Sequence, residues 1–168
     1  MSWLFAVAAP SASSDPVVEI AAPVVRRLHR YRQNRWWKRE AGGQLFARIE
    51  GEHWSIVEAT GPRKSDRRTR FGFVPDRTAE QAEIQNRFAK ALHYVGDWHT
   101  HPEPRANPSE EDRTSMARMV AASSFQLPGL LMLIVGTEPT SDGMWLSLHR
   151  RGGWWRPLRL LDGSHDGR

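Results

Sequence analysis

Residues 96–112 (GDWHTHPEPRANPSEED) carry the most informative pattern in the chain. His99 and His101 are two residues apart in a predicted strand, Tyr94–His101, so both imidazoles are expected on one face of the sheet. Two imidazoles on one side of a strand make half of a typical zinc site. Asp112 can add a hard oxygen ligand from the first turn of the next helix. Such a set leaves one tetrahedral position for water, as a catalytic zinc site requires.

Ser109 stands three residues before Asp112, which is also the spacing of a helix-capping box. A cap alone would explain both residues, but it would not explain the two histidines upstream. We expect both roles together, because a cap that fixes the first helical turn also aims the Asp112 carboxylate at the metal.

Hydrolysis at a metal also needs a group that transfers protons. Glu40 is the candidate, because it precedes a Gly42-Gly43 pair where the backbone can pack closely at the start of a predicted strand. Residue patterns alone do not separate Glu40 from Glu103 or Glu110.

The composition narrows the possible chemistry. The 168 residues include 24 Lys and Arg, 19 Asp and Glu and no Cys, for a formal net charge of +5. The lack of Cys excludes disulfide frameworks, Cys-based zinc sites, iron–sulfur clusters and thiol nucleophiles. Because no stretch of about 18 apolar residues occurs, we expect no membrane segment and a cytoplasmic location.

Hydrophobic periodicity predicts one α/β domain built on a mixed sheet. Helices are expected over Pro23–Asn34, Arg77–Leu92 and Ser109–Phe125. Strands are expected over Val17–Ile20, Gln44–Ile49, Trp54–Ala59, Phe71–Val74, Tyr94–His101, Leu130–Val135, Met144–His149 and Trp154–Leu160. The domain is expected to span residues 17–161, between a flexible lead-in over 1–16 and a disordered tail over 162–168.

Two further features have a simple interpretation and an open alternative. Trp36 and Trp37 are expected to pack in the core or at a helix end, with contact to a substrate tail as the alternative. The basic run Arg63–Arg70 is interpreted as a solvated loop that could instead meet an acidic partner. Nucleic acid is not expected as a partner, because no nucleic-acid-binding motif accompanies the charge.

The chain resembles the JAMM (JAB/MPN+) metallopeptidase family at three motifs. These are Glu40-Ala-Gly-Gly-Gln-Leu-Phe, His99-Thr-His101-Pro and, after seven residues from Pro102 to Pro108, Ser109-x-x-Asp112. The resemblance covers roughly residues 17–160. It implies a single-domain JAB/MPN fold, a cytidine-deaminase-like α/β sandwich with a mixed sheet flanked by helices.

The resemblance also implies a role for each motif residue. His99, His101 and Asp112 would bind Zn²⁺. Glu40 would act as general base for water and then as general acid for the leaving amine. Ser109 would donate a hydrogen bond to the oxyanion of the tetrahedral intermediate.

Within the family, the phrase Tyr94-Val-Gly-Asp-Trp-His-Thr-His-Pro-Glu is similar to JAB peptidases of bacterial antiphage CBASS operons. This similarity implies an isopeptidase that deconjugates and primes the extended C-terminal tail of a cyclic-nucleotide synthase, with E1/E2-like enzymes as partners. A peptidase of another ubiquitin-like or sulfur-carrier pathway, and a non-catalytic MPN binding module, remain as alternatives. The sequence does not define the oligomeric state.

Overall fold

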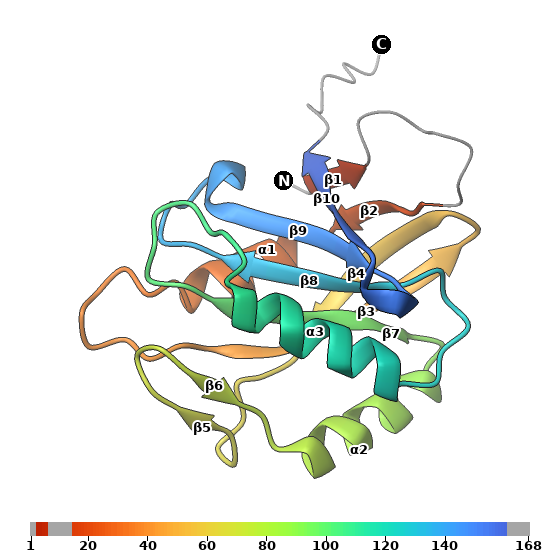
Figure 1. The fold of residues 1–168 in the computed structure, drawn as a ribbon, viewed down its shortest axis with the longest axis horizontal. Coiled ribbons are helices and arrows are strands. Elements are labelled where there is room, and N and C mark those ends of the chain that lie inside the picture. The colour runs from red at the N-terminus through yellow and green to blue at the C-terminus, as the bar shows by residue number, and fades with distance from the viewer. Residues whose placement is uncertain (1–2, 7–14, 161–168) are drawn as a thin grey trace.

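The computed structural model describes residues 3–6 and 15–160. Its strands form one sheet that curls into a closed barrel in the order β1-β10-β9-β8-β7-β3-β4-β2 (Figure 1). The strands of the barrel are β1 Trp3–Ala6, β2 Val17–Ile20, β3 Gly42–Glu50, β4 His53–Ala59, β7 His93–Thr100, β8 Leu130–Val135, β9 Met144–His149 and β10 Trp155–Leu160. A separate two-stranded hairpin consists of β5 Arg67–Arg68 and β6 Phe73–Val74.

The sheet is mixed, as the sequence predicts. The β7–β8 and β2–β4 pairs are parallel, whereas the other pairs in the barrel are antiparallel. β7 lies between β3 and β8, so both of its edges are hydrogen-bonded. The strand that carries the two histidines is therefore fixed in the middle of the sheet.

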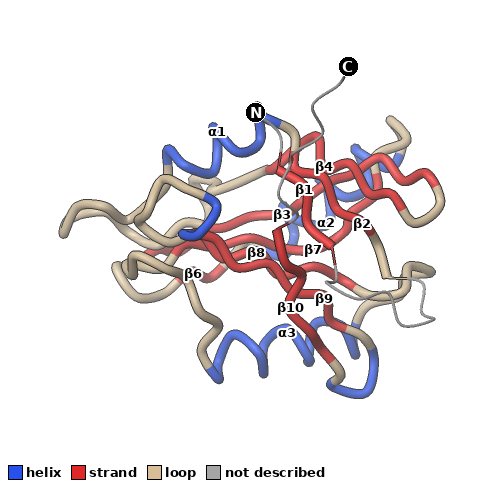
Figure 2. Tube along the Cα trace, turned by 90° about the horizontal axis from the view of Figure 1, so that it is seen from above, coloured by secondary structure: helices blue, strands red, loops and turns tan. Residues whose placement is uncertain are grey.

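The sequence of β8 is apolar without interruption because the strand is buried on both faces. All six of its residues are buried, and alternate side chains enter different hydrophobic clusters. Leu131, Leu133 and Val135 join the core that also contains the buried face of helix α1 (Ala22–Arg30). The other three residues of β8 pack against helix α3 (Glu110–Ala122), on the opposite side of the strands (Figure 2).

Helices α2 and α3 begin directly after a capping side chain, and all of the helices α1, α2 and α3 end earlier than expected. The Asp76 side chain caps helix α2 (Arg77–Phe88) by accepting hydrogen bonds from the backbone N–H groups of Thr78 and Ala79. The helix ends at Phe88, and the turn that follows it includes Ala91, whose φ of 57° belongs to the left-handed region. No helix in residues 3–6 and 15–160 is long and apolar enough to cross a membrane.

The closure of the barrel differs from the prediction. Trp3–Ala6 pairs with both β2 and β10, although the sequence analysis assigns it to a flexible lead-in. Four residues before a breaker-rich segment are too few to show a strand period, so the pairing comes from the two open edges that they bridge. The rest of that lead-in, residues 7–14, and the predicted tail over 162–168 lie outside the described residues.

Candidate active site

The two histidines meet at the end of β7. His99 is the partner of Gly42 in β3, and His101 follows the last residue of the strand while still donating its N–H to the carbonyl of Val135 (3.0 Å). The Nε2 atoms of His99 and His101 lie 3.1 Å apart. The prediction that both imidazoles share one face is confirmed.

Asp112 reaches the histidines from the first turn of α3. A capping box holds this turn: Ser109 Oγ accepts from the Asp112 N–H (3.0 Å), and Asp112 Oδ2 accepts from the Ser109 N–H (2.7 Å). The Asp112 carboxylate lies 3.1 Å from His99 Nε2 through Oδ1 and 3.3 Å from His101 Nε2 through Oδ2. The cap therefore orients the carboxylate, as expected.

The three side chains fit a tetrahedral zinc ion. Each offers one ligand atom, and these atoms lie within 4.8 Å of one another. Zinc bonds of usual length place neighbouring ligand atoms about 3.3–3.5 Å apart, close to the 3.1–3.3 Å separations seen here. The two imidazoles also lower the pKa of Asp112 far below its ordinary value, despite burial, so the carboxylate is ionised and ready to bind a cation.

Glu40 lies at the start of β3 beside these residues. Its N–H donates to the carbonyl of Thr69 (2.7 Å), and its own carbonyl accepts from Arg68 Nε (2.7 Å), so the β5–β6 hairpin holds its backbone. Burial raises the pKa of the Glu40 carboxyl, partly opposed by His99 and His101. A raised pKa suits a group that must take up a proton and release it.

The glycines after Glu40 allow the close packing that the sequence predicts. A Cβ on Gly43 would lie 1.9 Å from the carbonyl oxygen of Thr60, and one on Gly42 would lie 2.7 Å from the Phe73 ring. Side chains at these positions would push the strand away from its neighbours and move Glu40 with it.

Two buried residues that were not predicted from the sequence connect the parts of the site. Thr100, between the histidines, accepts from the Ala41 N–H (2.9 Å) and donates to Gln33 Oε1 (2.9 Å). Gln33 Nε2 then donates to the Arg70 carbonyl (2.7 Å) in the hairpin. The alternation of β7 places Thr100 on the buried face and could have indicated a polar contact there, but nothing in the sequence marks Gln33.

A cleft of about 540 Å³ opens at the site. Its walls are residues 71–75 of the hairpin segment, the α3 face with Ser115, Met116 and Met119, and the five motif residues. Asp97 lies at its inner end and accepts a hydrogen bond from the Tyr94 hydroxyl (2.9 Å). Burial raises the pKa of Asp97 to about 7, with a further contribution from the charge of Glu80.

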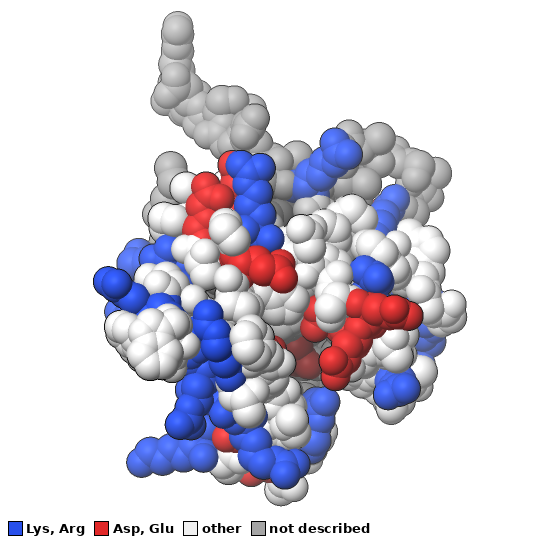
Figure 3. Space-filling model, turned by 60° about the vertical axis from the view of Figure 1, so that its left-hand side comes forward, with Lys and Arg blue, Asp and Glu red and all other residues white. Residues whose placement is uncertain are grey.

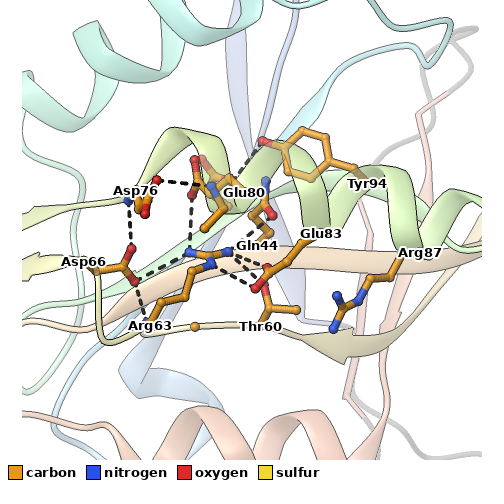
Figure 4. A network of polar contacts seen from close by, with 12 residues as sticks. Gln44, Thr60, Arg63, Asp66, Asp76, Glu80, Glu83, Arg87 and Tyr94 are labelled. Atoms are coloured by element: carbon orange, nitrogen blue, oxygen red, sulfur yellow. Dashed lines mark hydrogen bonds and ion pairs between the residues drawn. The ribbon is translucent and has the colours of Figure 1, made fainter.

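The basic run Arg63–Arg70 is not simply a solvated loop. The Arg63 guanidinium is largely enclosed and binds Glu83 at 2.5 Å, with the carboxylates of Asp66 and Glu80 within 4 Å (Figure 4). Asp66 in turn accepts from the N–H groups of Arg63 and Asp76 (2.6 and 2.8 Å). This network fastens the hairpin segment and α2 to the sheet, so one wall of the cleft is firmly placed.

Comparison with known families identifies this arrangement. Residues 21–147 match the profile described as prokaryotic homologs of the JAB domain, and this range contains all three motifs. The chain belongs to this JAB family. The resemblance seen in the motifs is therefore confirmed.

Several relatives of this JAB-domain chain carry functional names. It is 34% identical over 127 residues to a CD-NTase/cGAS isopeptidase of Escherichia coli, covering 74% of this chain and 79% of the relative. It is 33% identical over 128 residues to a protein of the same name from Vibrio cholerae, covering 74% and 80%. A protein from Sinorhizobium fredii named probable metalloprotease y4qB is 29% identical over 111 residues, covering 63% and 68%.

A solved structure supports the JAB-domain fold. The solution structure of protein DSY2949 from Desulfitobacterium hafniense superposes with a TM-score of 0.59 at 18% identity, covering 84% of this chain and 88% of that one. The α/β fold predicted from the sequence is confirmed, with three helices around a curled mixed sheet.

Proposed function

We propose that this chain is a zinc-dependent isopeptidase that hydrolyses the bond after the C-terminal tail of a conjugated CD-NTase in a bacterial antiphage CBASS system. The same reaction on an unprocessed tail would prime it. One observation carries the proposal: the ligand atoms of His99, His101 and Asp112 converge in a cleft that Glu40 also lines. The names of the E. coli and V. cholerae relatives supply the substrate class.

Glu40 moves the protons in this reaction. A zinc ion held by the three ligands would supply Lewis acidity and make water more acidic. The Glu40 carboxylate takes a proton from the attacking water and returns it to the leaving amine, so that one group acts first as base and then as acid. Its buried position raises its affinity for that proton.

Ser109 stabilises the oxyanion that forms when water adds to the carbonyl. Its hydroxyl has one hydrogen, which points to Asp112 Oδ2 (2.7 Å) in this structure. The oxyanion role therefore requires that hydrogen to turn toward the substrate while Oγ keeps accepting from the Asp112 N–H. A donor of this kind contributes roughly 10²–10³ in rate.

The tail would enter as an extended strand. Both edges of β7 are paired, but among the described residues β6 pairs only with β5, and Phe73 and Val74 line the cleft. A tail could add its backbone to this free edge and leave its last residues at the metal. We expect small residues such as glycine next to the cut, where the tail would pass beside His99 and His101.

E1/E2-like enzymes that attach the tail are the further partners we propose. The cytoplasmic location stays a prediction.

The function is tested with a fusion substrate. A CD-NTase from the same genome is joined through its C-terminus to green fluorescent protein, and cleavage is followed after zinc content has been measured. We expect about one zinc per chain and release of the fluorescent protein. Glu40→Gln should retain the zinc and lose cleavage by roughly 10²–10⁴-fold, the usual contribution of proton transfer.

The matched control is Glu110→Gln, which changes an exposed carboxylate outside the cleft lining that sequence patterns could not separate from Glu40. It should cleave the fusion at nearly the wild-type rate. Full activity of Glu40→Gln, or cleavage of a sulfur-carrier tail in place of the CD-NTase fusion, would contradict the proposal.

A further inference from the structure

Three aromatic side chains stand in solvent at one end of the cleft. Trp36, Trp37 and Phe71 are 77%, 61% and 78% exposed, which makes the expectation that the two tryptophans pack in the core or at a helix end wrong. The three belong to two separate segments, the connection between α1 and β3 and the turn of the β5–β6 hairpin. Large exposed aromatics that gather at one place usually mark a contact surface.

The protein holds these rings in place. Arg70 Nη1 donates to the carbonyls of Arg35 (3.2 Å) and Trp36 (2.5 Å), and its guanidinium lies 5.5 Å from the centre of the Phe71 ring. The two tryptophan rings meet edge to face at 5.7 Å, and the Arg35 guanidinium lies 5.9 Å from the Trp37 ring. We call this surface the aromatic rim, and it consists of Arg35, Trp36, Trp37, Arg39, Arg70 and Phe71.

The charged side chains in and around the aromatic rim are all basic. Residues 31–39 and 67–75 contain seven Lys and Arg residues and no Asp or Glu. The opposite side of the cleft has the exposed carboxylates of Glu103 and Glu111. Figure 3 shows this division, with Lys and Arg over the left and lower part of the face and acidic groups around the hollow at its centre and right.

The rim continues directly from the cleft. Phe71 belongs to both, because it lines the cleft and contacts Arg70, whereas Trp36 and Trp37 lie beyond the cleft walls. A tail lying in the cleft against β6 would therefore bring the folded protein that carries it close to the rim.

We propose that the aromatic rim binds the folded domain of the protein substrate. The substrate surface that it binds carries carboxylates around an apolar side chain. This inference rests on the proposed function. The basic residues of the rim favour a substrate domain with an acidic surface. Trp36, Trp37 and Phe71 supply the apolar contact, and both Trp and Arg are frequent anchors of protein interfaces. A nucleic acid fits less well, since its phosphates would meet the carboxylates on the other side of the cleft.

The test compares two substrates with one set of variants. The first substrate is the CD-NTase–green fluorescent protein fusion, and the second is a fluorogenic peptide with the last ten residues of that CD-NTase. Trp36→Ala/Trp37→Ala and Arg35→Glu/Arg39→Glu should lower kcat/KM for the fusion about 10- to 30-fold, the size of effect typical of interface anchors. Both should cleave the peptide within about twofold of wild type, since these side chains do not line the cleft. For the wild type, KM for the fusion alone should rise with salt.

The control is Phe88→Ala, which removes another exposed aromatic (67%) at the end of α2, outside the rim and the cleft. It should leave both substrates unaffected. Equal cleavage of the fusion by wild type and both rim variants would overturn the inference, as would an equal loss on both substrates. Rim-dependent binding of a single-stranded oligonucleotide with no effect on the fusion would also overturn it. If wild type cleaves neither substrate, the proposed function fails first and this inference falls with it.

Discussion

Ser109 combines a structural and a proposed catalytic role that substitution can separate. Ser109→Ala removes the α3 cap, which costs about 1 kcal/mol of stability, and removes the oxyanion donor, which should lower kcat roughly 10²–10³-fold. Asp76→Ala removes the cap of α2 in a comparable way without touching the proposed metal ligands. Urea unfolding and peptide cleavage should therefore show two destabilised variants, of which only one is inactive. Equal activities would assign Ser109 to the cap alone.

Thr100 connects the proposed metal ligands to Glu40, the proposed base. Thr100→Val keeps the shape of the side chain but leaves the Ala41 N–H and Gln33 Oε1 buried without this partner. We expect a loss of about 1–3 kcal/mol in the free energy of unfolding, the usual cost of an unsatisfied buried polar group. Thr114→Val, on the exposed face of α3, is the matched control and should change stability little. An unchanged unfolding midpoint for Thr100→Val would mean that water replaces the hydroxyl.

At the scale of elements, the β5–β6 hairpin depends on Arg63. Arg63→Ala would remove this cation from the carboxylates of Asp66 and Glu83, whereas Glu80 would keep its ion pair with Arg77 (2.8 Å). Breaking a buried ion pair by removing one partner costs about 3–5 kcal/mol, and we expect a loss of that order in urea unfolding. Arg67→Ala, which removes an exposed arginine of β5, is the control. Similar stability of the two variants would show that the hairpin does not need the network.

The elements also show what sequence patterns could predict. β7, β8 and the capped start of α3 were predictable, because a strand buried on both faces and a Ser-x-x-Asp cap leave local signals. β1 and β5 left none, because they are only four and two residues long, whereas the predicted strand Phe71–Val74 contains β6. For the same reason the convergence of His99, His101 and Asp112 could be predicted from their spacing, whereas Gln33 and the enclosed position of Arg63 could not.

At the scale of the whole molecule, closing the barrel buries polar groups in its wall. Residue 149 is a histidine only 3% exposed, and its ring stacks on Trp155 across the β9–β10 pair. Trp145 Nε1 donates to Ser147 Oγ (3.1 Å), so the serine hydrogen is free to donate to His149 Nε2 (2.9 Å), which requires a neutral ring. Burial accordingly lowers the pKa of His149 to about 4.

This histidine should make the stability of the whole fold depend on pH. With a pKa of about 4 in the folded chain and about 6.5 in the unfolded chain, the unfolded chain binds more protons between these values. The free energy of unfolding therefore falls as the pH drops from 6.5 toward 4, by up to about 3 kcal/mol from this group. His149→Gln should flatten that part of the profile, measured by urea unfolding from pH 4 to 7, whereas His53→Gln, at a half-exposed position, should not. If the profile of His149→Gln keeps the wild-type slope, the acid sensitivity comes from other groups and the buried ring does not control it.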